Sequence, residues 1–176
     1  MIKFFSFSFL CAISLLAQES QNTKVLSQYQ LAAKEHGLIL KDYVSKNDGV
    51  QLGWCTHIAF GPGEQEIISD LKNNRLIYRN NAKESFQVSP IAVKGLHSLA
   101  YNPADKLYYV NDTTNHRMIS FADLSKDEIA VERKEMAGVK LQRPHDVVID
   151  PNSSWIYAIN PNTGQVFRFT ALGENE

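Results

Sequence analysis

Two histidines at equivalent places in a repeated sequence are the residues best suited to chemistry. His97 begins an apolar segment that ends at Pro103, and His145 begins a related segment that ends at Pro151, 48 residues further along the chain. Neutral imidazole is a common zinc ligand, and a catalytic zinc keeps one position open for water or substrate. Equivalent positions in neighbouring repeats point the same way, so we expect these side chains to converge as candidate metal ligands. The alternative is that both are strand-start residues bonded to backbone or water.

A third histidine, His57, lies near the corresponding point of the first repeat. Counting back from Pro62 puts Thr56 in register instead of His57. Side chains alternate between the two faces of a strand, so a shift of one residue aims His57 at the wrong face. A β-bulge would restore it. His57 therefore joins the candidate ligands on the condition that a bulge is present.

These histidines belong to three copies of one repeat. The pattern Asp-x-x-Asn-x-Arg-Leu/Met-Ile begins at Asp70 and again at Asp112, and a related copy begins at Asn160. Apolar strands alternate with turns rich in Pro, Asn and Asp, and no helix intervenes, which predicts antiparallel meanders. Four-stranded units of ~40–50 residues are typical of propeller blades. We therefore predict an all-β fold, a partial propeller of about three blades at residues 55–94, 95–142 and 143–171, with fourth strands near 85–88 and 128–132 in the first two.

The repeated pattern resembles the NHL repeat of six-bladed β-propellers, over roughly residues 55–171. In the third copy Asn160, Thr163 and Gln165 replace the Asp, Asn and Arg of the pattern. Residues 96–100 and 143–148 are also similar to blades of peptidyl-α-hydroxyglycine α-amidating lyases, propellers whose channel zinc is held by histidines. That resemblance implies zinc ligation by the first two histidines, and by His57 only under the bulge condition. It identifies no catalytic Tyr or Arg here.

The acidic and basic residues of the pattern are expected to be structural. Asp70 and Asp112 stand where an Asp side chain bonds the backbone of the following turn. Arg75 and Arg117 are expected to brace adjacent blades or to face solvent. Metal binding by the two aspartates is the alternative.

Five further residues have open roles. Asp146 and Asp150 flank the strand after His145, and calcium binding by these two carboxylates stays an open alternative. Cys55 lies in an apolar stretch and is expected to be a small buried side chain rather than a nucleophile. Asn111 and Asn152 fit the glycosylation pattern, which matters only in a eukaryotic secretory pathway.

Residues 1–20 read as a secretory signal peptide. Lys3 is followed by an uncharged, mostly apolar run from Phe4 to Ala17. That run is shorter than the ~20 apolar residues of a membrane-spanning helix. We expect cleavage near residue 18 and a secreted or periplasmic protein with no membrane span. A buried helix or a short anchor is the alternative. In residues 21–54 we expect a helix at 25–35 and an edge strand at 38–44.

Composition narrows the function. The sequence is 44% hydrophobic and 21% charged, as in ordinary globular proteins. The 18 basic and 19 acidic side chains give a net charge of −1, which argues against nucleic acid as a partner. The leading hypothesis is a binding module for a protein, peptide or small molecule. The alternative is a metal-dependent lyase or hydrolase that uses zinc or calcium, so enzyme status stays open.

Three blades are too few to close a ring, and an open array exposes two sheet edges. Two chains could form a six-bladed homodimer, each lending residues 38–44 to the other's last blade, since twofold oligomers are the commonest kind. The competing explanation is that the sequence is part of a longer propeller.

Overall fold

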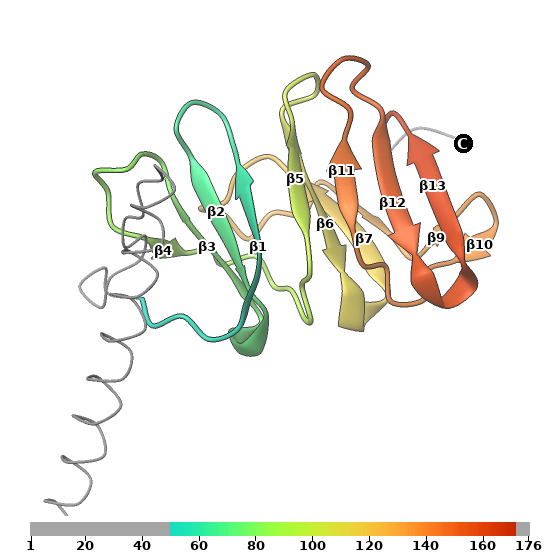
Figure 1. Ribbon diagram of the computed structural model, residues 1–176, viewed down its shortest axis with the longest axis horizontal. Coiled ribbons are helices and arrows are strands. Elements are labelled where there is room, and N and C mark those ends of the chain that lie inside the picture. The colour runs from blue at the N-terminus through green and yellow to red at the C-terminus, as the bar shows by residue number, and fades with distance from the viewer. Residues whose placement is uncertain (1–49, 172–176) are drawn as a thin grey trace, which may run out of the picture. The chain divides into compact units, whose positions relative to one another are not determined.

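The computed structural model describes residues 50–171. In this range 13 β-strands form three propeller-like sheets and one small hairpin (Figure 1). The predicted all-β class with partial propeller blades is confirmed. The expected signal peptide at 1–20, the helix at 25–35 and the strand at 38–44 lie outside the described residues. Among the described residues, no helix combines the length and the apolar character needed to cross a membrane.

The sheets follow one another along the chain, and each is an antiparallel meander in sequence order. Blade 1 contains β1 (Cys55–Phe60), β2 (Glu66–Asp70), β3 (Arg75–Arg79) and β4 (Gln87–Val88). Blade 2 contains β5 (Leu99–Asn102), β6 (Leu107–Asp112), β7 (Arg117–Phe121) and β8 (Val131–Arg133). Blade 3 contains β11 (Val147–Ile149), β12 (Ile156–Asn160) and β13 (Gln165–Phe169). The hairpin pairs β9 (Glu135–Met136) with β10 (Val139–Lys140).

The second and third strands of every blade are joined by the same turn. A three-residue 3-10 helix leads to one residue in the left-handed conformation: Asn74, His116 and Gly164, with φ of 51°, 54° and 70°. Glycine adopts this conformation without strain, and Asn and His are among the residues that tolerate it best. The repeated pattern therefore encodes one turn three times.

Each described blade contributes to an apolar core with its neighbour. Blades 1 and 2 share one cluster and blades 2 and 3 share another. We call the side of a blade that faces the following blade its forward face, and the opposite side its back face. In blade 2, Ala100, Tyr109 and Met118 form the forward face, while Leu99, Val110 and Ile119 form the back face. Burial on both faces explains why these strands are apolar almost throughout.

Candidate functional site

His97 and His145 do come together. Their rings stack with centroids 4.0 Å apart and an interplanar angle of 25°. They stand just before β5 and β11, so two neighbouring blades supply one ring each. His97 is half-buried and His145 is exposed. Burial, then the charges of His145 and Arg143, lower the pKa of His97 below its usual value.

Hydrogen bonds between blades position this pair. The Ser98 hydroxyl donates to the His145 carbonyl at 3.2 Å and accepts from the Val147 amide at 2.9 Å. Between blades 1 and 2, the Thr56 hydroxyl donates to the Leu96 carbonyl at 3.2 Å or the His97 carbonyl at 3.3 Å. Sequence periodicity does not indicate that Ser98 or Thr56 positions the pair, although Ser98 directly precedes β5 and Thr56 lies in β1.

The first blade does contain a bulge at the place in question. Cys55 pairs with Asp70 and His57 pairs with Ser69, which leaves Thr56 as the extra residue. Blade 3 has the same irregularity, because the His145 amide donates to the Ile159 carbonyl and the Ile159 amide donates to the Asp146 carbonyl, so that both residues lie opposite Ile159. Since Ser69 and Ile159 are equivalent strand residues, Thr56 holds the histidine position of blade 1, and the bulge does not bring His57 into it. His57 falls one place further along β1, on the same face as Ala59.

The histidine pair alone does not make a zinc site. Two imidazoles on one tetrahedral zinc have ring centres about 5 Å apart, because each Zn–N bond is about 2 Å long. The observed 4.0 Å stack is tighter, so the rings would have to turn apart to share an ion. Within residues 50–171, no three His, Cys, Asp or Glu side chains gather around a common point that could hold a metal.

The aspartates of the repeated pattern act as clamps on the segment that enters each blade. Asp112, fully buried, accepts hydrogen bonds from the Lys94 amide at 2.6 Å, from Asn115 at 2.9 Å and from Arg117 at 2.7 Å. Arg117 also donates to the Ala92 carbonyl at 3.1 Å. The expected structural role is therefore present, but the backbone partner precedes the blade instead of following the turn.

The same clamp recurs in the other two blades. Asp70 accepts from the Gly53 amide at 3.0 Å and from Arg75 at 3.0 Å. In blade 3 the amide of Asn160 replaces the carboxylate and accepts from the Gln142 backbone amide at 2.8 Å. In blade 2, burial alone would lower the pKa of Arg117. The hydrogen bonds and charges of Asp112 and Glu132 outweigh burial and raise that pKa.

Cys55 differs from the expectation, because it is exposed rather than buried. The bulge moves it out of the regular alternation of β1. Partial desolvation, then the Asp70 carboxylate, raise the pKa of its thiol, which disfavours the reactive thiolate. The prediction that it is not a nucleophile still agrees with this environment.

The calcium and glycosylation candidates occupy ordinary turns or the core. Asp150 accepts from the Ser153 hydroxyl at 2.5 Å and from the Asn152 amide at 2.9 Å, which together lower its pKa. Asp146 accepts from the Val147 amide at 3.0 Å. Asn111 is fully buried, so the folded chain cannot be glycosylated there, whereas Asn152 is exposed.

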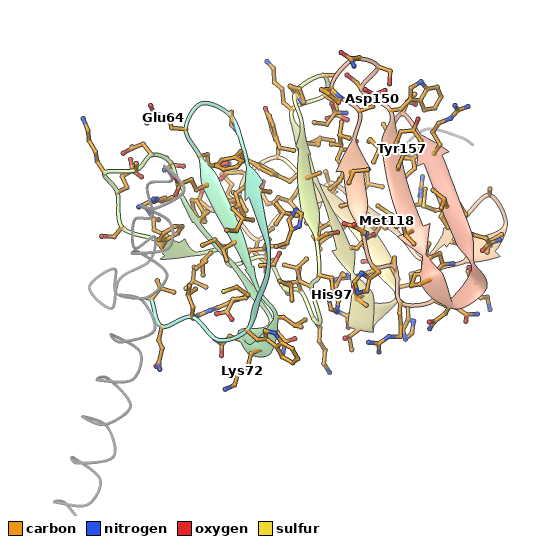
Figure 2. All side chains as sticks on the ribbon, in the orientation of Figure 1. Glu64, Lys72, His97, Met118, Asp150 and Tyr157 are labelled. Carbon is orange, nitrogen blue, oxygen red and sulfur yellow. The ribbon has the colours of Figure 1, made fainter. Side chains whose placement is uncertain are left out.

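The two ends of the blade array differ in charge. Glu64 and Asp150 lie at one end, whereas Lys72 and His97 lie at the other, which we call the histidine end (Figure 2). Lys94 and Arg143 are exposed at the histidine end, next to the clamp turn of blade 2, which they contact through their backbone amides. A pocket of about 460 Å³ opens beside the blade 1 clamp. Its lining comprises Val50, Gln51, Leu52, Gly53, Lys72, Asn73, Arg75 and Val88.

Fold and site together define a partial β-propeller with paired histidines before the innermost strands of two adjacent blades. No protein-family model matches the sequence, and no curated protein matches it. The solved structures that are similar to this chain include the following two. Hydrazine synthase from Kuenenia stuttgartiensis has 19% identity over 74% of this chain and 38% of its own, with a TM-score of 0.46. A candidate 6-phosphogluconolactonase from Bacteroides uniformis has 18% identity over 73% of this chain and 44% of its own, with a TM-score of 0.41. The chain thus spans about two fifths of each.

Proposed function

We propose that this chain is an exported NHL-type propeller module that binds an anionic partner at its histidine end. The partner is a peptide, protein or small molecule that carries carboxylate or phosphate groups. The observation that carries the proposal is the stacked pair of His97 and His145 beside the exposed cation Arg143. Imidazole edges and a guanidinium donate hydrogen bonds that anionic oxygens accept.

Charge balance at this end supports the proposal. The arginines of the first two clamps are already paired with buried aspartates, so their charge is largely compensated. Lys72, Lys94 and Arg143 are exposed, and within residues 50–171 their side chains form no ion pair with a carboxylate, although the Lys94 backbone amide bonds Asp112. An excess of cations on one side attracts anions and speeds their association.

Export rests on the first 20 residues, with their charged start and short apolar run. Mass spectrometry of protein collected outside the cytoplasm should show a chain that begins near residue 18. Recovery of a cytoplasmic form that begins at Met1 would contradict export and leave the binding proposal standing.

Binding is tested with two labelled peptides, hexaglutamate and hexalysine, by fluorescence anisotropy on the full chain. We expect the acidic peptide to bind, and binding to weaken with added salt. Arg143→Gln should weaken it several-fold. Lys83→Gln removes the same charge from an exposed site between β3 and β4 and serves as the matched control. Equal binding of both peptides, or an equal loss in both variants, would contradict the proposal.

A metal-dependent lyase or hydrolase is the second candidate. The convergence of two imidazoles from separate blades favours it, although a third ligand must come from beyond the described residues. Calorimetric titration with zinc should then show stoichiometric binding that is lost in His97→Gln and in His145→Gln. His57→Gln asks whether the third histidine takes part. Absence of zinc binding by the unmodified chain would remove this candidate.

A further inference from the structure

The clamp of blade 1 lacks a carboxylate that the clamp of blade 2 has. In blade 2, Arg117 donates from Nε to Asp112 and from Nη1 to Glu132, both at 2.7 Å. Glu132 is also ion-paired with Lys134 at 3.2 Å. Two cations and two carboxylates therefore balance in this group of four side chains.

Strand pairing identifies the residue that stands in place of Glu132 in blade 1. In blade 2, Glu132 pairs with Ile119. In blade 1, Val88 pairs with Ile77. Ile77 and Ile119 are equivalent, because each lies two residues after the arginine of the repeated pattern. Blade 1 therefore has Val88, which is 48% exposed, where blade 2 has its second carboxylate.

The arginine of blade 1 makes only part of the contacts of its counterpart. Arg75 donates from Nε to Asp70 at 3.0 Å and from Nη2 to the Gln51 carbonyl at 2.7 Å. Its side chain is 26% exposed, against 15% for Arg117. Within residues 50–171, Nη1 of Arg75 is therefore left without the acceptor that Glu132 supplies in blade 2.

The pocket beside the blade 1 clamp occupies the place of the missing carboxylate, because Arg75 and Val88 both line it. Its volume of about 460 Å³ lies in the usual range for small-molecule sites. Lys72, exposed at the histidine end, is the second cation of the lining (Figure 2). None of the described residues that line the pocket is acidic. With the single carboxylate of Asp70, the two cations leave a charge of +1.

We propose that this pocket binds a small organic acid, whose carboxylate takes the position that Glu132 holds in blade 2. The carboxylate accepts charge-assisted hydrogen bonds from Nη1 of Arg75 and from the ammonium of Lys72, which are among the strong ones. Leu52 and Val88 offer apolar contacts to a short hydrocarbon chain. The site belongs to blade 1 and does not depend on the histidine pair between blades 2 and 3.

Titration of the full chain with hexanoate, followed by backbone amide resonances, tests the site. Hexanamide has nearly the same shape without the charge and is the control ligand. We expect hexanoate to cause saturable shifts at Gly53, Lys72 and Asn73 that weaken with added salt, and hexanamide to cause none. No saturable shifts with hexanoate, or equal shifts with hexanamide, would overturn the proposal. Tighter binding of inorganic phosphate would overturn the assignment to an organic acid.

Val88→Glu should close the site, because it gives Arg75 a carboxylate from the chain itself. We expect the affinity for hexanoate to fall roughly tenfold, as for the loss of one charge-assisted hydrogen bond, with an unchanged β-sheet circular dichroism spectrum. Val166→Glu makes the same change at another exposed strand valine and is the matched control. An equal loss in both variants, or full affinity in Val88→Glu, would contradict the proposal.

Two lysine variants test the second cation without altering the sheet. Lys72→Gln should weaken hexanoate binding several-fold, whereas Lys83→Gln, which also removes an exposed charge, should leave it unchanged. Equal affinities in the two variants would remove Lys72 from the site. Arg143→Gln separates this site from the histidine end partner site and should also leave hexanoate binding unchanged. Loss of hexanoate binding in Arg143→Gln would place the carboxylate beside the histidines and overturn a site in blade 1.

Blade 2 provides the converse experiment. Glu132→Val removes the second carboxylate from Arg117 and leaves Lys134 as the other cation. This variant should gain a second hexanoate site, seen as saturable shifts at Thr114 and Asn115, which are equivalent to Lys72 and Asn73. Binding confined to blade 1 in this variant would show that the missing carboxylate does not create the site, and would overturn the argument from the two clamps.

Discussion

Blades 2 and 3 use the same positions for different chemistry. Asp112 and Asn160 occupy equivalent places in the clamp, and each accepts a backbone hydrogen bond from the segment that enters its blade. Asp112 is also ion-paired with Arg117, whereas the equivalent of that arginine in blade 3 is Gln165. Both side chains therefore hold the backbone segment that enters the blade. Only blade 2 adds an ion pair to this hydrogen bond.

The largest expected effect comes from removing the clamps. Asp112→Ala should destabilise the chain by about 3–5 kcal/mol, because Arg117 and the Lys94 amide lose a buried acceptor. Asn160→Ala should cost about 1–3 kcal/mol, since no charge loses its partner. Urea unfolding of both variants measures the difference. Equal losses would show that the ion pair contributes nothing beyond the backbone bond.

Blades 2 and 3 also differ in their second strands, β6 and β12. Tyr108 in blade 2 is buried and bonds its hydroxyl to Gln65, whereas its equivalent in blade 3 is Ile156. Burial, then the charges of Tyr101 and Asp123, raise the pKa of Tyr108 to about 12.

A pKa that is higher in the folded chain makes stability fall at alkaline pH. The contribution is present below pH 10 and is lost as pH rises through about 12. Two pKa units correspond to about 2–3 kcal/mol. In Tyr108→Phe, the free energy of unfolding should therefore change less with pH over this range. Urea unfolding at several pH values measures it. An unchanged slope in this variant would assign the alkaline loss to other groups.

The neutral clamp of blade 3 can be converted into the charged one. Asn160→Asp alone buries a carboxylate without its arginine and should cost about 2 kcal/mol, within the range for an uncompensated buried polar group. Adding Gln165→Arg should recover most of that loss. The double-mutant cycle isolates the coupling of the new pair. A coupling near zero would mean that the surroundings of Arg117, including Glu132, make the pair in blade 2 favourable.

Sequence periodicity predicted the blades and the clamps well, because turn chemistry and apolar spacing are local properties. It did not predict what depends on hydrogen-bond pairing between strands. Thr56 looks like an ordinary strand residue, yet it is the extra residue of a bulge that sets Cys55 opposite Asp70, and Cys55 is exposed. The backbone partner of Asp112 was also missed, because Lys94 lies 18 residues earlier in the chain. The stacking of the two histidines depends on packing between blades, and spacing indicates only that they converge.

The smallest expected effect concerns the histidines. His97 is half-buried in blade 2 and its counterpart in blade 3 is exposed. Because burial, His145 and Arg143 lower the pKa of His97, the unfolded chain takes up its proton first as pH falls. The free energy of unfolding should therefore decline as pH falls from about 6.5, the unperturbed pKa of histidine, through the lower pKa of His97 in the folded chain. His97→Gln should remove that decline.

Nuclear magnetic resonance titration of the ring protons separates the causes of this shift. His145→Gln removes one repelling charge and part of the cover over His97, so it should raise the pKa of His97 toward 6.5 without reaching it. Arg143→Gln should raise it less, since its charge is the smallest of the three causes. Lys83→Gln, which removes an exposed charge between β3 and β4, should leave the pKa of His97 unmoved. A pKa of His97 at or above 6.5 in the unmodified chain would contradict this account, because it would mean that burial and the two neighbouring charges do not disfavour the protonated ring.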